Sequence, residues 1–507
     1  NPSLVGSEMC IRDRDKKDLH RGALTNLVGY GLKLANPLLL ILVANEYGAS
    51  ALGDFLVIQA VLLLLTRFLA LGLDKGVLWW VAKDEDQKQI ATIFWTLFLF
   101  GSLVSGGVFW SAQEYLQWKG GVGHLSEHFR IMLLGLLPAL LTDILLHAIM
   151  GTKKMGAQVF IKETLVPVSM VAMALLLFML GFDSFGLAWA FSFSHWLGLL
   201  ATLVVFLKQF SFRSLIPQTI SFPNVVLWKY ALPLWIAEVS NSFLQRMDIF
   251  ALTFFVKTGV VPIPGAVGIY GIVVQFANAV RSIRRSFDPI VLAIVSNVGA
   301  RKESKRLSEG FSHATFLVMA TQFPIFVFFF FFAEWLLGIY GAAFLEGVAS
   351  IWVLSAFWVI NGTLGLCGVV VLGLGYSYFS LINVWIAIAV KALCLWLLIP
   401  IWGLEGAAFA VGFAYTIQGL AQLWQMKVVS GGWNYHKKAF LPLWWGAIGV
   451  IIAYTIRVLL KDVSLPEVPV WSWWPVGMSR DILGALIPFL AFVVVYVMGM
   501  GQLYLEA

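Results

Sequence analysis

The sequence predicts an all-α polytopic membrane protein with about 14 transmembrane helices, arranged as two six-helix lobes in a parallel repeat plus two C-terminal helices. Composition, the number of long apolar segments and an internal repeat lead to this fold class. Of the 507 residues, 60% are hydrophobic and 12% are charged, and the mean hydropathy is +0.86. A soluble protein with so few charges cannot cover its surface. Soluble enzymes, disordered scaffolds and nucleic-acid modules are therefore excluded.

The apolar segments set the number of predicted helices. A membrane-spanning helix needs about 20 mostly apolar residues, and fourteen segments of the chain meet this requirement. None of the connecting segments is long enough for a soluble catalytic domain. The predicted spans are 23–44, 51–73, 89–111, 130–150, 161–181, 186–207, 230–256, 266–296, 312–338, 347–372, 378–401, 405–426, 440–460 and 481–501.

Residues 1–14 are expected to lie outside the natural protein. The run Leu4–Arg14 reads LVGSEMCIRDR and matches one reading frame of a sequencing-library transposon adapter. Such segments are left out of fold reasoning, so residues 15–22 become the cytoplasmic N-terminal segment. The three cysteines give no disulfide framework, and no CxxC or HExxH spacing indicates a metal site.

The basic residues of the short loops predict the orientation. With the N-terminus in the cytoplasm, the inner segments hold 18 Lys and Arg residues and the outer loops hold 4. An excess of this kind on one side marks the cytoplasmic face. Trp471, Trp473 and Trp474 lie in the last outer loop and suit the outer membrane interface. We therefore expect both termini to be cytoplasmic, and we interpret the net charge of +7 as topology rather than DNA affinity.

An internal repeat divides the chain into lobes. Three regions align at offsets of 215, 222 and 220 residues: Ala51–Phe55 with Ala266–Tyr270, Gly151 with Gly373, and Gly186–Ala190 with Gly406–Ala410. Parallel repeats are a transporter architecture with the substrate site between the repeats. The predicted domains are an N-lobe (23–207), a cytoplasmic linker (208–229), a C-lobe (230–426) and two extra helices (427–507).

Polar residues within the spans are the candidate site residues, because ionisable groups at membrane depth usually face the bundle interior or a wet cavity. On the eighth span, one helical face carries Asn278, Arg281, Arg284, Arg285 and Asp288. Guanidinium groups match phosphate oxygens, so this face predicts an anion site. The alternative is that the arginines reach the cytoplasmic interface or pair with Asp288.

Three further groups of polar residues are candidates. On the first span, Lys33 is a second anion ligand, with Asn26 and Tyr30 on the same face of the helix. The seventh span carries Glu238, Asn241, Gln245 and Asp248 on one stripe, where a carboxylate binds a coupling ion or pairs with an arginine. On the fourth span, Asp143 and His147 form either an acid–histidine relay or an interhelical hydrogen bond. The residues assigned to possible ion coupling are Glu238, Asp248, Asp143, His147 and Asp288, and those assigned to a polar glycan cavity are Asn26, Tyr30, Asn241, Gln245 and Asn278.

Several short runs resemble the Wzx-like oligosaccharide flippases, the polysaccharide-biosynthesis membrane proteins of the multidrug/oligosaccharidyl-lipid/polysaccharide (MOP, MATE-like) exporter superfamily. The resemblance covers about residues 20–430. Pro233 and Asp248 match the pattern of the seventh helix, and Gly268 and Tyr270 match that of the eighth. The runs are Gly48–Phe55, Leu71–Gly76, Ala231–Leu234, Arg246–Ile249, Val267–Tyr270, Gly373–Gly375 and Trp402–Ala408.

The resemblance implies a protein of the bacterial inner membrane that moves an undecaprenyl-diphosphate-linked oligosaccharide from the inner to the outer leaflet by alternating access. It implies that the protein needs no cofactor and uses an H⁺ or Na⁺ gradient as its energy source. The implied partners are the lipid bilayer, the lipid-linked oligosaccharide and polysaccharide assembly machinery, and nucleic acid is not among them. No catalysis is expected. Two alternatives stay open: a MATE-like cation or drug antiporter, and a membrane-embedded glycan polymerase or ligase, which usually carries a large outer loop.

Overall fold

The computed structural model describes residues 35–83, 88–118, 123–152, 156–216, 223–300, 304–376, 378–430, 437–460 and 478–505. Within these ranges the chain consists of helices and turns and has no β-strand. The prediction of an all-helical fold is confirmed. The chain divides into two compact units, one of residues 1–47 and 54–243 and the other of residues 48–53 and 244–507. Each unit is described by itself below.

The first unit is a bundle of helices around α6. This helix is buried along most of its length and packs against α3, α4 and α9. A seven-residue π-helical segment, η1, precedes α8 and carries Lys162. The elements are α2 (Ala35–Leu69), α3 (Leu73–Ala82), α4 (Lys88–Trp118), α5 (Gly123–Leu133), α6 (Leu136–Gly151), α7 (Gly156–Gln158), η1 (Val159–Leu165), α8 (Val166–Met179), α9 (Phe185–Leu207), η2 (Phe212–Leu215) and the first part of α10 (Val225–Lys257).

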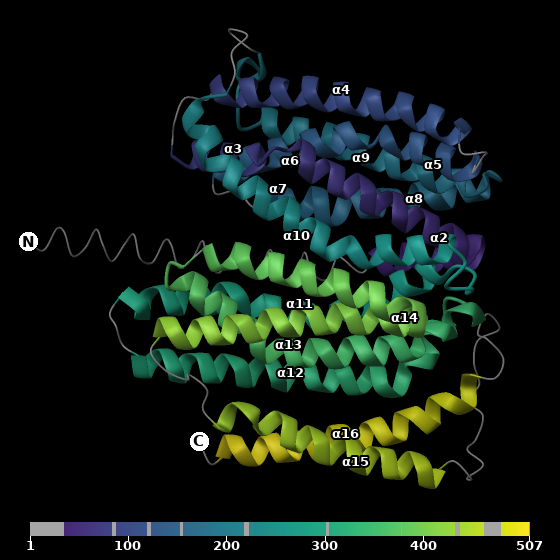
Figure 1. The fold of residues 1–507 in the computed structure, drawn as a ribbon, viewed down its shortest axis with the longest axis vertical. Coiled ribbons are helices and arrows are strands. Elements are labelled where there is room, and N and C mark those ends of the chain that lie inside the picture. Colours follow the sequence, from purple (N-terminus) through teal and green to yellow (C-terminus); the bar gives the residue numbers. More distant parts are fainter. Residues whose placement is uncertain are drawn as a thin grey trace, which may run out of the picture. The chain divides into compact units, whose positions relative to one another are not determined.

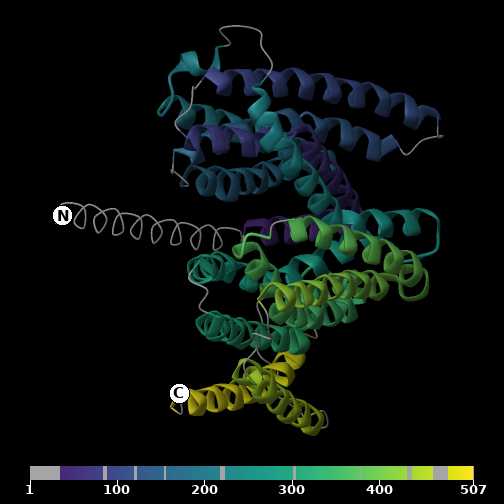
Figure 2. The ribbon, with the colours of Figure 1, turned by 60° about the vertical axis from the view of Figure 1, so that its left-hand side comes forward.

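The second unit contains residues 48–53 of α2, the rest of α10 and the helices that follow it. Four of these, α11 to α14, lie side by side (Figures 1 and 2). The C-terminal pair α15 and α16 packs against α12 through an aromatic core that includes Phe323, Phe492 and Tyr496. The elements are α11 (Ala266–Ala300), α12 (Ser304–Gly338), η3 (Ala342–Gly347), α13 (Val348–Gly373), α14 (Tyr378–Ser430), η4 (Lys437–Phe440), α15 (Leu441–Leu460) and α16 (Met478–Leu505).

The described helices are long and apolar enough for a multi-pass membrane protein. Ten of them meet a length and hydropathy criterion for crossing a membrane. One of the ten is the 53-residue α14, which bends at Gly403 (φ 56°, ψ −120°), between two predicted spans. A glycine accepts this positive φ without the steric cost that a side chain adds. Every predicted span from the second onward lies largely on described helices, although the second runs from α2 into α3 and the fourth from α5 into α6. The count of fourteen crossings stays a prediction.

Repeat-related glycines meet within the second unit, where residues 48–53 of α2 cross α11. Gly53 and Gly268 are equivalent in the repeat at an offset of 215 residues. A Cβ on either glycine would lie 3.0 Å from the backbone nitrogen of the other, and a Cβ on Gly268 would also lie 2.0 Å from the carbonyl oxygen of Ala49. Gly48 bends α2 just before this crossing (φ 80°, ψ 171°). The short run at the start of the second span therefore packs on α11 backbone to backbone.

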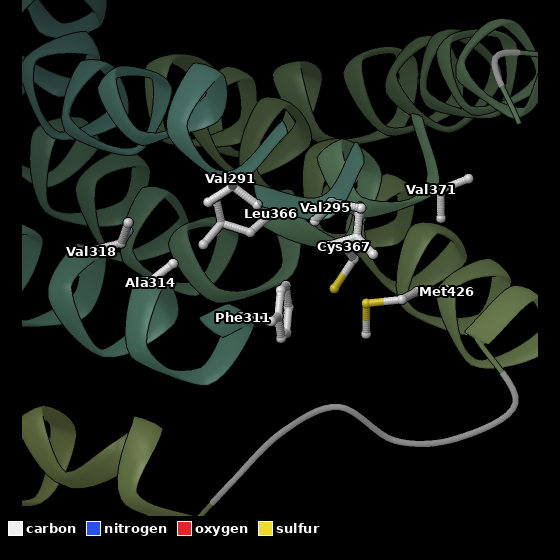
Figure 3. Close-up of a cluster of buried hydrophobic side chains, with 10 residues drawn as sticks. Val291, Val295, Phe311, Ala314, Val318, Leu366, Cys367, Val371 and Met426 are labelled. Atoms are coloured by element: carbon white, nitrogen blue, oxygen red, sulfur yellow. The ribbon is translucent and has the colours of Figure 1, made fainter. Parts of the chain in front are cut away.

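The buried seam of α11 explains how its arginines are placed. The buried residues at helical spacing are Tyr270, Val273, Ala277 and Val280. Further along α11, after Asp288, this buried face continues in a cluster of hydrophobic side chains. This cluster joins α11, α12, α13 and α14 (Figure 3). Its buried members are Val291, Val295, Phe311, Ala314, Val318, Leu366, Cys367, Val370, Val371 and Met426. Counting on from Val280 by four residues gives Arg284, so an arginine occupies a position in the helix seam between two apolar layers.

Candidate functional site

The arginines of α11 meet an aromatic pair from α13 and α14. The Arg281 guanidinium carbon lies 4.5 Å from the ring centroid of Trp358 and 4.5 Å from that of Tyr415. The two rings are themselves 5.0 Å apart, and Asn361 Nδ2 on α13 donates a hydrogen bond of 3.0 Å to the Tyr415 carbonyl oxygen. A guanidinium over aromatic faces is held by cation–π attraction. The aromatic pair therefore fixes the position of Arg281.

Arg284 lies one turn further along α11. Its side chain is 13% exposed, and Nη1 donates to Asp288 Oδ1 at 3.0 Å. It runs over Gly365 of α13, where a Cβ would lie 2.9 Å from both Cδ and Nε of the arginine. Because any side chain at position 365 would press on the guanidinium stem, the glycine makes room for Arg284. Arg285, in contrast, is exposed, so the predicted group of three arginines separates into two enclosed cations and one exposed cation.

Several buried polar atoms at this site have no partner within the described part of the chain. Nε of Arg284, Nε1 of Trp358 and the hydroxyl of Tyr415 are all buried without a hydrogen bond there. Leaving a buried donor unsatisfied costs about 1–3 kcal/mol, so most such groups in native proteins have a partner. Two of these three atoms can only donate hydrogen bonds. The cluster therefore suits a ligand that brings acceptor oxygens.

The charge at the site agrees with its hydrogen-bonding capacity. Arg281, Arg284 and the exposed Arg285 share this stretch of α11 with one carboxylate, that of Asp288. Guanidinium groups bind phosphate through parallel N–H···O bonds. Asn278, assigned to a polar cavity, is half-buried one turn before Arg281. Arg281, Arg284, Trp358 and Tyr415 thus form an enclosed, positively charged set of donors, which we call the α11 anion site.

A second polar cluster in the same unit uses Asp248 in a different way. Its Oδ1 accepts from Lys391 Nζ at 2.9 Å and its Oδ2 accepts from the Tyr270 hydroxyl at 3.0 Å. Lys391 also donates to the Leu244 carbonyl oxygen at 2.7 Å. The Lys391 and Asp248 side chains are 1% and 4% exposed. Both carboxylate oxygens are occupied, so in this conformation Asp248 joins α10, α11 and α14.

A third polar cluster lies in the first unit. Lys162 of η1 donates to Asp143 Oδ1 at 2.5 Å, and Arg67 of α2 lies 3.6 Å from Asp143 Oδ2 and 3.5 Å from Asp74 Oδ2. The sequence placed Asp143 and His147 together as a possible relay. In the structure, the His147 ring contacts the Asp143 backbone carbonyl at 2.6 Å, and the Asp143 carboxylate pairs with Lys162 and Arg67.

The other predicted site residues fall in different places. Glu238 and Gln245 are half-buried on α10, and Asn241 on the same helix is exposed, so the predicted polar stripe does not share one environment. Asn26, Tyr30 and Lys33 lie outside the described residues.

Sequence reasoning missed Trp358 and Tyr415, because an aromatic residue in an apolar span has no distinctive pattern. Lys75 entered the sequence analysis only as one of the 18 basic residues of the inner segments, and Asp74 was not considered as a partner for Arg67 or His147.

Comparison with known proteins gives the family. A sequence profile described as polysaccharide biosynthesis protein (Polysacc_synt) matches residues 19–287, which is more than half of the chain. The chain belongs to the polysaccharide biosynthesis protein family. The matched range includes α2 to α10 and the arginines of α11. Curated protein sequences give no match.

Solved structures of low identity share the fold of this family member. The lipid II flippase MurJ in an inward-closed conformation aligns with a TM-score of 0.74 at 13% identity, over 95% of this chain and 99% of that one. An inward-facing MATE multidrug transporter of the MOP superfamily aligns with a TM-score of 0.65 at 13% identity, over 80% and 98%. A MOP transporter from Pyrococcus furiosus, described as having a binding pocket of reversed polarity, aligns at 0.61 and 14%, over 82% and 96%.

Proposed function

We propose that this protein is a flippase that carries an undecaprenyl-diphosphate-linked oligosaccharide from the inner to the outer leaflet of the bacterial inner membrane by alternating access. Membership of the polysaccharide biosynthesis family and a fold shared with a lipid II flippase support this class. In this proposal both termini are cytoplasmic and an ion gradient supplies the energy. The substrate changes leaflet without making or breaking a covalent bond, so the protein acts as a transporter and not as an enzyme.

The α11 anion site is the observation that carries the proposal. A diphosphate presents several acceptor oxygens, and the site offers the edge of Arg281, Nε of Arg284 and the indole N–H of Trp358. Charge-assisted hydrogen bonds of this kind contribute about 1.5–3 kcal/mol each. The diphosphate is common to substrates with different glycans. A site that binds it therefore indicates the class of lipid carrier and does not indicate which sugar is attached.

The competing functions fit the site less well. A cation or drug antiporter needs carboxylates where its substrate binds, and the α11 anion site has Arg281 and Arg284 beside one aspartate, Asp288. A glycan polymerase or ligase usually carries a large outer loop, and the longest connecting segments here, 208–229 and 461–480, have only the length of loops. Both alternatives are therefore less well supported than lipid-diphosphate transfer.

Native mass spectrometry of the purified protein titrated with undecaprenyl diphosphate tests the assignment. We expect the double variant Arg281→Ala/Arg284→Ala to bind at least about 10-fold more weakly than wild type, which corresponds to about 1.4 kcal/mol. In proteoliposomes the same variant should flip the lipid-linked substrate more slowly. Arg457→Ala is the matched control, because Arg457 also lies over an aromatic ring, 5.8 Å from Phe331, on the distant helix α15. Wild-type binding and flipping by the double variant would contradict the proposal.

A further inference from the structure

The histidine of the third polar cluster has a defined hydrogen-bonding state. Lys75 Nζ lies 3.2 Å from His147 Nε2. A lysine ammonium only donates, so Nε2 must accept. The other ring nitrogen, Nδ1, lies 2.6 Å from the Asp143 carbonyl oxygen, which only accepts. The proton of the ring is therefore on Nδ1, and His147 is neutral in this conformation.

Next to this arrangement lies a carboxylate suited to the protonated ring. Asp74 Oδ2 is 4.0 Å from His147 Nε2, beyond a hydrogen bond but within a small ring movement of one. Asp74 is itself buried and lies 3.5 Å from Arg67 Nη1. Nε2 thus lies between an ammonium group and a carboxylate, and its protonation state decides which of the two it can bond.

We propose that this cluster is a proton-binding site in which His147 exchanges Lys75 for Asp74. A proton from water binds Nε2, the new N–H donates to Asp74 Oδ2, and the ammonium of Lys75 loses its acceptor and faces a like charge. Lys75 keeps its own protons and moves toward solvent. The lysine is half-buried and has a flexible four-carbon stem, so the movement needs no change in the helix backbone.

The surrounding charges decide which group takes the proton. Asp143 is engaged by Lys162 and Arg67, so its carboxylate is already neutralised by cations from two elements. Among all of these groups, only a histidine changes charge between about pH 5 and 8 without a large perturbation. The charged groups that act on His147 are Asp74 and Lys75 of α3 and Asp143 on its own helix. Arg67 of α2 and Lys162 of η1 pair with these carboxylates, and His195 of α9 interacts with Asp143 and Lys162.

The exchange has a structural consequence for the first unit. Lys75 and Asp74 are adjacent on the short helix α3, which begins at a left-handed turn at Leu71 and Gly72 (φ 51° and 71°). His147 is near the end of α6, which packs against α3. Binding of one proton therefore replaces the Lys75–His147 hydrogen bond between these helices with a His147–Asp74 hydrogen bond. This inference concerns the first unit alone and does not depend on the α11 anion site.

Histidine-labelled protein in nanodiscs, followed by NMR of the ring resonances from about pH 5 to 8, tests the proposal. The His147 resonance, identified by its loss in His147→Gln, should titrate. Its midpoint should rise by about one pH unit or more in Lys75→Met, because a neighbouring cation is removed, and should fall in Asp74→Asn. Proton uptake on acidification should exceed that of His147→Gln by about one proton per chain.

His195→Gln is the matched control. His195 also bonds the carbonyl oxygen four residues earlier, Phe191 O at 2.8 Å, through Nδ1. Its removal should leave the His147 titration unchanged, and the His195 resonance in the other variants reports that the bundle is still folded. A His147 resonance that stays fixed over the whole range, or a midpoint that is the same in wild type and Lys75→Met, would overturn the proposal.

Discussion

Truncating Lys391 should destabilise the second unit strongly, because it leaves a buried carboxylate without its counter-ion. In Lys391→Met, Asp248 keeps only the hydrogen bond from Tyr270. Two charge-assisted bonds are lost, to Asp248 and to the Leu244 carbonyl oxygen. At about 1.5–3 kcal/mol each, the loss is about 3–6 kcal/mol, in line with about 3–5 kcal/mol for breaking a buried ion pair.

A double-mutant cycle separates this reason from a simple loss of packing. In Lys391→Met/Asp248→Leu both charges are gone, and the stability should recover to within about 1–2 kcal/mol of wild type, because an apolar replacement avoids the desolvation of two ions. Unfolding of the protein in detergent, followed by tryptophan fluorescence with increasing denaturant, gives the differences between variants. Equal destabilisation in Lys391→Met and the double variant would refute the reasoning.

Two further predictions concern the indole of the anion site and the crossing of α2 with α11. Trp358→Phe keeps a ring for Arg281 and removes the unpartnered N–H, so undecaprenyl diphosphate should bind about 3- to 10-fold more weakly at an unchanged melting temperature; unchanged affinity would show that the indole N–H does not contact the lipid. Gly268→Val places a Cβ 2.0 Å from the Ala49 carbonyl oxygen and should cost about 1–3 kcal/mol. Gly107→Val, where nothing lies within 4 Å, is the control in the same unfolding measurement, and equal stabilities would contradict the assigned close approach.

The positions of the helices followed from the sequence, but the breaks within them did not. A helix that crosses lipid must satisfy its backbone hydrogen bonds internally, so a long apolar run is enough to locate it. The predicted fourth span (130–150) is divided at residues 134–135 into α5 and α6, and the predicted fifth span begins with the π-helical η1. These irregularities depend on what neighbouring helices offer, and apolar periodicity carries no sign of them.

The candidate sites show the same division at the level of single residues. Helical spacing placed Arg281, Arg284 and Asp288 on one face, and the structure pairs Arg284 with Asp288 through an i,i+4 contact. Trp358 and Tyr415, which hold Arg281, come from helices far along the chain. The repeat aligned Gly53 with Gly268, but only the fold showed that the two glycines pack against each other.

The sequence by itself determined that the chain is a helical membrane protein with charged residues on particular helix faces, because lipid selects long apolar segments and local spacing fixes which side chains share a face. The tertiary structure alone decided which charges neutralise one another. Lys391 meets Asp248 across 143 residues, whereas Lys75 meets His147 across 72. Which partner a buried charge finds depends on how helices pack, and packing brings together residues that local sequence cannot relate.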